Sequence, residues 1–123
     1  MNGNRILVLE DDDETLAFVS LVLRGEGYEV YERDLLLEHV AEVKYLAPSL
    51  MIIDVFQGAE PAGWEFIQHL KAHPATASIP IIVYTAGSLT AEQLQQSKHQ
   101  GIPVVYKPFD LNELLRLIQS LIE

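Results

Sequence analysis

Three short, uninterrupted apolar runs constrain the fold of this chain more than any other feature. Residues 6–9, 50–53 and 81–84 are each four apolar or aromatic residues in a row, without the polar residue at every second position that a half-exposed strand would have. Continuous apolarity of this length is typical of a parallel strand buried on both faces, and such sheets are covered by helices on both sides. The runs therefore predict the central strands of an α/β fold.

Stretches with helical spacing alternate with the strand-like segments. The last stretch is the clearest, because Asp110 is placed as an N-cap and Glu113 as its capping-box partner. The predicted strands are residues 6–9, 28–31, 50–55, 79–85 and 104–107. The predicted helices are one that Gly25 and Gly27 end, then 34–46, 64–72 and 90–100, and one after Asp110. Five alternating pairs imply a parallel sheet with helices on both faces.

Length and composition narrow the classes of function. The 123 residues suit one domain spanning 1–123, and 49% hydrophobic residues are enough for a buried core. A net charge of −10, from 8 basic and 18 acidic residues, argues against nucleic-acid binding by this domain. The chain has no cysteine, which excludes disulfides and thiolate sites, and no long apolar segment, so we expect no membrane contact and a cytoplasmic location.

Acids, one hydroxyl and one lysine stand where four predicted strands end. Glu10 and Asp11 follow the first strand, and Asp54 follows the apolar run of the third. Thr85 ends the fourth strand and Lys107 ends the fifth. Because the carboxyl ends of parallel strands share one edge where ligands bind, we expect these side chains to meet. Three clustered carboxylates need a cation and suit Mg²⁺, while the lysine and threonine suit a phosphoryl group.

Four short motifs occur in a fixed order along the chain. They are Ile-Leu-Val-Leu-Glu-Asp-Asp at 6–12, Ile-Ile-Asp at 52–54, Tyr-Thr-Ala at 84–86 and Tyr-Lys-Pro-Phe at 106–109. With these motifs the chain resembles a response-regulator receiver domain, the flavodoxin-like partner of histidine kinases, over nearly its whole length. The resemblance implies a (βα)5 three-layer sandwich with a five-stranded parallel sheet of order 2-1-3-4-5. Each motif alone is weak, but the four together are a strong joint signal.

The resemblance also implies a metal site and a phosphoacceptor. Asp54 would accept a phosphoryl group from a histidine kinase or phosphotransfer protein, in a reaction that the domain itself catalyses with Mg²⁺. Asp11 would bind Mg²⁺ directly and Glu10 mostly through water, together with Asp54 and the backbone carbonyl of Phe56. These assignments follow from the family pattern and not from spacing alone.

Further implied roles concern the phosphoryl group and the response to it. Thr85 would contact a phosphoryl oxygen and Lys107 would pair with the same group, on a Lys107-Pro108 bond that is typically cis in this family. The acyl phosphate would draw the Thr85 hydroxyl inward and so switch a surface that binds a downstream effector.

The chain departs from the family pattern at two places near the site. The loop after Asp54 is one residue longer than usual and has Gly58 where the family has proline. The position of the switch aromatic, three residues before Lys107, is Val104, and Tyr106 projects on the same face of the strand and could replace the aromatic in part. The fourth helix is also poor in charge, so we expect a monomer or a weak dimer.

Two other functions compete with the phosphoacceptor. A pseudo-receiver would bind proteins without being phosphorylated, which the altered loop and Val104 favour and the intact acid, threonine and lysine set opposes. A small phosphatase using Asp54 as nucleophile usually needs a second acid two residues on, and that position is Phe56. We interpret His39, His69, His73 and His99 as surface or half-buried residues, and Trp64 as part of the core.

Overall fold

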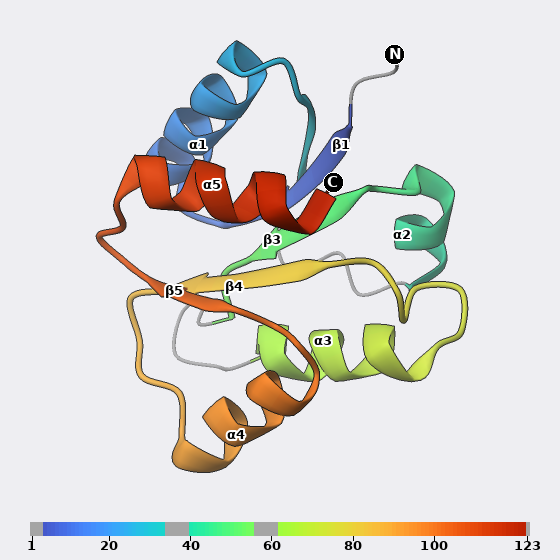
Figure 1. The fold of residues 1–123 in the computed structure, drawn as a ribbon. Coiled ribbons are helices and arrows are strands. Elements are labelled where there is room, and N and C mark those ends of the chain that lie inside the picture. Colours follow the sequence, from blue (N-terminus) through green and yellow to red (C-terminus); the bar gives the residue numbers. More distant parts are fainter. Residues whose placement is uncertain (1–3, 34–39, 56–61, 123) are drawn as a thin grey trace.

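Five parallel strands form one sheet in the computed structural model, which describes residues 4–33, 40–55 and 62–122 (Figure 1). The strands are β1 (Arg5–Leu9), β2 (Glu29–Arg33), β3 (Leu50–Ile53), β4 (Ile81–Thr85) and β5 (Val104–Tyr106). Their order in the sheet is β2-β1-β3-β4-β5, and each neighbouring pair is parallel. This order confirms the predicted flavodoxin-like (βα)5 architecture.

Five helices within the described residues cover the two faces of the sheet. They are α1 (Asp13–Gly25), α2 (Val40–Leu46), α3 (Ala62–Ala72), α4 (Ala91–His99) and α5 (Leu111–Ile122). Figure 1 shows α1 and α5 side by side on one face, with α3 and α4 on the other. The buried side chains agree, since α1 and α5 share one core cluster, whereas α2, α3 and α4 contribute to a second.

Alternate side chains of the central strands fill these two cores. In β1, Ile6 and Val8 belong to the core under α1 and α5, whereas Leu7 and Leu9 belong to the core under α2, α3 and α4. All four side chains are fully buried. Uninterrupted apolar runs therefore do mark the strands that are buried on both faces.

The ends of several elements differ from the predicted ones. β4 begins at Ile81 rather than 79, because Pro80 offers its carbonyl to the Met51 N–H at 2.9 Å but has no N–H to extend the ladder. β3 ends at Ile53 rather than 55, and β2 covers Glu29–Arg33 rather than 28–31. α3 begins at Ala62, two residues before the predicted 64. The helix predicted at 34–46 is described from Val40 on, and 34–39 lie outside the described residues.

Helix caps explain where two other helices begin. The Thr90 side chain accepts a hydrogen bond from the Gln93 N–H, and the Gln93 side chain accepts one from the Thr90 N–H, so α4 begins after a capping box that we did not predict. At α5, the Glu113 N–H donates to Asp110 Oδ1 at 3.2 Å, which confirms the predicted N-cap.

Candidate functional site

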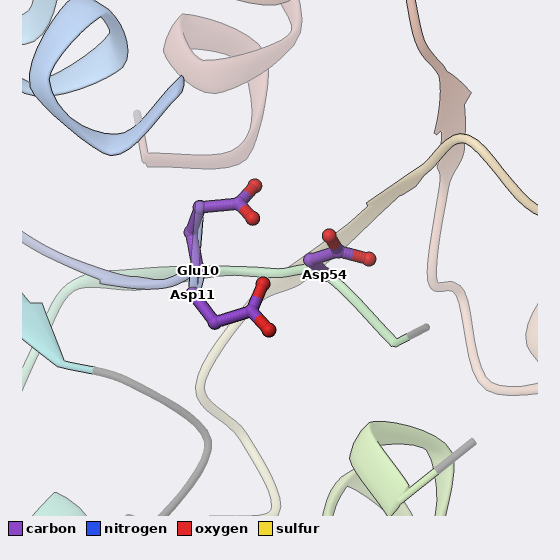
Figure 2. Close-up of side chains that lie close together, drawn as sticks. All are labelled: Glu10, Asp11 and Asp54. Atoms are coloured by element: carbon purple, nitrogen blue, oxygen red, sulfur yellow. The ribbon is translucent and has the colours of Figure 1, made fainter. Parts of the chain in front are cut away.

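The carboxyl ends of β1 and β3 bring three carboxylates together. Leu9 pairs with Ile53 in the register of the two strands, and the Asp54 N–H donates to the Leu9 carbonyl at 3.0 Å. One carboxylate oxygen from each of Glu10, Asp11 and Asp54 lies within 4.8 Å of the other two (Figure 2). Acids this close repel one another, so the cluster favours a cation between them.

Lys107 supplies a positive charge to this cluster from the end of β5. Its Nζ donates hydrogen bonds to Glu10 Oε1 at 2.8 Å and to Asp54 Oδ2 at 3.0 Å. Its backbone N–H donates to the Thr85 carbonyl at 2.8 Å, and the Lys107–Pro108 peptide bond is cis, as expected. The ends of four strands thus meet around one lysine.

Glu10 is a buried carboxylate with a donor on each oxygen. Its side chain is 1% exposed, and Oε2 accepts from the Asp12 N–H at 3.1 Å while Oε1 accepts from Lys107. Burial alone would raise the pKa of Glu10, but Lys107, the nearby Tyr84 hydroxyl and the Asp12 N–H together outweigh it and hold the pKa below its usual value. Glu10 is therefore charged at neutral pH.

The Lys107 ammonium is stabilised by the same arrangement. Burial alone would lower the pKa of Lys107, but its hydrogen bonds to Glu10 and Asp54, and the negative charges of these two acids, raise it above the usual value. One ammonium then faces three carboxylates, of which Asp11 is exposed. The negative charge left over is at the open side of the cluster, where a divalent cation with oxygen ligands fits.

Thr85 presents a fixed hydroxyl at the same edge. Its side chain is fully buried, and its Oγ1 accepts a hydrogen bond from the Gly87 N–H at 2.9 Å. A hydroxyl that accepts one hydrogen bond keeps its proton to donate elsewhere. The backbone turn after β4 therefore sets the position of this donor.

Gly63 lets the first turn of α3 lie against the backbone that carries Asp54. A Cβ at this position would lie 2.7 Å from the Val55 Cα and 3.1 Å from the Asp54 carbonyl oxygen, and backbone atoms at these distances cannot move aside easily. The close approach requires glycine. Its sequence signal was only a glycine in the loop after Asp54.

Tyr84 is a neighbour of the site that we placed in the Tyr-Thr-Ala motif of the fourth strand without giving it a role in the site. It is fully buried, and Lys107 Nζ lies 4.6 Å from the centroid of its ring. Phe109 packs edge-on against the same ring, with centroids 5.9 Å apart. The Tyr84 hydroxyl lies close enough to Glu10 to influence its pKa, yet within the described residues it has no hydrogen bond of ordinary geometry.

Other predicted positions have mixed outcomes. Phe56, expected to offer its carbonyl to Mg²⁺, lies outside the described residues. Val104 packs against the core formed with α2, α3 and α4, whereas Tyr106 is 48% exposed. Trp64 is in that core, as predicted. His69, His73 and His99 are exposed, and His39 is outside the described residues.

The model of the response regulator receiver domain family matches residues 6–119 of this chain. The chain therefore belongs to this family, the receiver domains of two-component response regulators. The family assignment agrees with the resemblance found in the four sequence motifs.

Curated relatives are similar over almost all of this chain. The DNA-binding dual master transcriptional regulator RpaA of Synechocystis sp. is 28% identical over 118 residues, which are 96% of this chain and 48% of the relative. The phosphate regulon transcriptional regulatory protein PhoB of Escherichia coli is 28% identical over 119 residues, which are 96% of this chain and 51% of PhoB. The chain thus spans about half the length of the curated relatives it matches.

Solved structures of similar fold include chemotaxis response regulators. Chemotaxis response regulator CheY4 of Vibrio cholerae has a TM-score of 0.80 and 25% identity, and the match covers 98% of this chain and 99% of CheY4. A CheY-like receiver domain protein from Methanospirillum hungatei has a TM-score of 0.81 and 26% identity over 97% of this chain and 93% of that one. Across the described ranges, none of the helices combines the length and apolar character needed to cross a bilayer.

Proposed function

We propose that this domain accepts a phosphoryl group on Asp54 in a Mg²⁺-dependent reaction and thereby switches a surface that binds other proteins. The donor would be a histidine kinase or a phosphotransfer protein, as in the family. One observation carries the proposal: Lys107 bridges Glu10 and Asp54 at 2.8 Å and 3.0 Å within a cluster of three carboxylates. A lysine held by hydrogen bonds among acids at the sheet edge suits an anionic substrate that arrives with a cation.

The carboxylates fit a magnesium ion. Glu10, Asp11 and Asp54 would hold it, with the Phe56 carbonyl as a further ligand, and hard oxygen ligands of this kind are those that Mg²⁺ prefers. When bound, the ion would supply positive charge that offsets the repulsion between an aspartate and a phosphoryl group. Glu10 has a donor on each oxygen, so it fits a ligand that acts through water.

The side chains of the site supply positioning and charge. An Asp54 carboxylate oxygen would attack phosphorus, forming an O–P bond as the P–N bond to the donor histidine breaks and the electron pair leaves with the imidazole. Lys107 would turn from the acids toward the phosphoryl oxygens, and Thr85 would donate its hydroxyl proton to one of them. In phosphoryl transfer the protein contributes mainly the positions of the reacting groups and the stabilisation of their charge.

The remaining parts of the proposal concern the domain and its partners. Residues 1–123 would form one receiver domain, which works in the cytoplasm where a kinase phosphohistidine is made from ATP. A groove of about 360 Å³ opens beside the site and offers a donor protein access to Lys107. Its lining also includes Asp12, Glu14, Thr15, Phe18, Pro108 and Phe109. An effector protein or domain would recognise the phosphorylated form.

Intact-mass measurement after incubation with acetyl phosphate and Mg²⁺ tests the proposal. We expect wild-type protein to gain one phosphoryl group and to lose this ability with EDTA. Asp54→Asn should gain none. Asp13→Asn removes the same charge from the exposed first turn of α1, so it should be phosphorylated as the wild type is.

Two results would contradict the proposal in different ways. Phosphoryl gain by Asp54→Asn would place the acceptor elsewhere. No gain by the wild type would leave the pseudo-receiver, whose partners would then be sought by capture with unphosphorylated protein.

A further inference from the structure

The buried Tyr84 hydroxyl lowers the stability of the folded protein. The side chain is fully buried, and the hydroxyl has no hydrogen-bond partner of ordinary geometry among the described residues. Burying a hydroxyl without a partner costs free energy because its hydrogen bonds to water are lost. A phenylalanine at position 84 would fill nearly the same volume and could pack against Phe109 in the same way, without the cost of a buried hydroxyl. Packing alone therefore does not explain why this position carries a hydroxyl.

The surroundings of Tyr84 indicate two neighbours on which it acts. The Lys107 ammonium lies 4.6 Å from the ring centroid, a position that the negative face of the ring favours. The hydroxyl lies beside the Glu10 carboxylate. Burial first, then the approach of the hydroxyl to the Glu10 carboxylate, and then the negative charges of Glu10 and Asp54 raise the pKa of Tyr84, so the phenol keeps its proton and is a donor.

Glu10 would lose the direct donor to its Oε1 if Lys107 moved. Its Oε1 accepts from Lys107 Nζ at 2.8 Å, and its other oxygen is already bonded to the Asp12 N–H. The carboxylate is 1% exposed, so bulk water does not readily take the place of the lysine. A buried charge that loses its donor is strongly destabilised, which would oppose any movement of Lys107 toward a phosphoryl group.

We propose that Tyr84 is a positioning residue that holds Lys107 with its ring and replaces it as the donor to Glu10 when the lysine turns to a phosphoryl group on Asp54. This inference rests on the proposed function. The Tyr84 O–H forms a hydrogen bond to Glu10 as the Lys107 N–H leaves it, and no proton is transferred. The hydroxyl, which has no hydrogen bond of ordinary geometry in the present structure, becomes the donor to Glu10 when Asp54 is phosphorylated.

Melting temperatures with EDTA test the donor exchange without phosphorylation. Tyr84→Phe in the wild-type background removes a hydroxyl that has no partner, so the melting temperature should stay the same or rise. In the Lys107→Ala background Tyr84 becomes the replacement donor to Glu10, so the same change should lower the melting temperature by about 3–6 °C. Tyr45→Phe, which removes a hydroxyl from an exposed tyrosine of α2, should have no effect in either background.

Phosphoryl uptake from acetyl phosphate with Mg²⁺ tests the role in the reaction. Tyr84→Phe should slow uptake roughly tenfold. Without the hydroxyl, no side chain replaces Lys107 as the donor to Glu10, so moving the lysine toward the phosphoryl group costs more free energy. Tyr45→Phe should leave the rate unchanged. A role only in packing would instead lower stability in the wild-type background and the rate together.

The outcomes separate this inference from the proposed function. Equal melting changes for Tyr84→Phe in the two backgrounds, or wild-type uptake by Tyr84→Phe, overturn the inference while Asp54 phosphorylation stands. If wild-type protein takes up no phosphoryl group, the role in phosphorylation falls with the proposed function, even where the melting data support donor exchange.

Discussion

The Lys107 ammonium and the Glu10 carboxylate form a 2.8 Å ion pair between residues 97 positions apart. Their side chains are only 19% and 1% exposed, so water screens the pair less than it screens an ion pair on the surface. Breaking it leaves two acids without their counter-charge. We expect Lys107→Ala to lower the free energy of unfolding of the metal-free protein by about 2–4 kcal/mol, measured by urea unfolding with EDTA.

An exposed lysine provides the control for this change. Lys98→Ala, near the end of α4, should alter the free energy of unfolding by no more than about 0.5 kcal/mol. Equal effects of the two substitutions would mean that the Lys107 ion pair contributes nothing to folding.

The Glu10 pKa predicts a specific dependence of stability on acid. The carboxyl has its usual pKa of 4.5 in the unfolded chain and a lower one in the folded protein. Between these values the unfolded chain binds the proton and the folded protein does not, so acid favours unfolding. The contribution of Glu10 is therefore fully present above about pH 4.5 and is lost as the pH falls through the lower folded value.

Glu10→Gln removes this titration and should flatten the acid limb. We expect its free energy of unfolding, measured in EDTA, to be lower than that of the wild type near neutral pH but to fall less steeply in acid. Glu14→Gln, at an exposed position of α1, should keep the wild-type slope. An unchanged slope in Glu10→Gln would contradict the lowered pKa.

The sheet and its order could be predicted because they depend on local patterns. Four-residue apolar runs become β3 and most of β1 and β4, and the residues that follow them converge because parallel strands end at one edge. That logic placed Glu10, Asp54 and Lys107 in one cluster, and the distances agree. Strand ends were predicted less well, because they depend on pairing with a neighbour, as the carbonyl of Pro80 illustrates.

Contacts that depend on three-dimensional packing could not be predicted. The Lys107 ammonium lies over the Tyr84 ring because the lysine side chain reaches from the end of β5 to Glu10 and Asp54, and no spacing in the sequence encodes this. The capping box of Thr90 and Gln93 has a sequence pattern, but the pattern alone does not show that both hydrogen bonds form. The Thr85–Gly87 hydrogen bond depends on the turn after β4.

Gly63 gives a prediction about how α3 supports Asp54. A methyl group there would lie 2.7 Å from the Val55 Cα, so Gly63→Ala must push the helix away from the end of β3. We expect a loss of about 1–3 kcal/mol in the free energy of unfolding, measured by urea unfolding, together with slower phosphorylation because the backbone of Asp54 shifts.

Gly25→Ala is the matched control. A Cβ at position 25, at the end of α1, meets no atom within 4 Å. Its free energy of unfolding should change by less than about 0.5 kcal/mol, or rise slightly because alanine favours helix. If Gly63→Ala behaved in the same way, the close packing of α3 on β3 would be wrong.

Substitutions of Thr85 can separate the effect of its hydroxyl from the effect of its branched shape. Its Oγ1 accepts from the Gly87 N–H at 2.9 Å and, in the proposed reaction, donates to a phosphoryl oxygen. Thr85→Val keeps the branched shape but removes both bonds. We expect the free energy of unfolding to fall by about 1 kcal/mol and phosphoryl uptake from acetyl phosphate to slow at least about tenfold.

Thr85→Ser tests whether the hydroxyl is the cause. Serine loses only the methyl group and can still accept from Gly87 and donate to the phosphoryl group, so uptake should return to near the wild-type rate. Its stability should differ from the wild type only by the buried methyl, about 1 kcal/mol. Wild-type uptake by Thr85→Val would show that the hydroxyl makes no contact in the reaction.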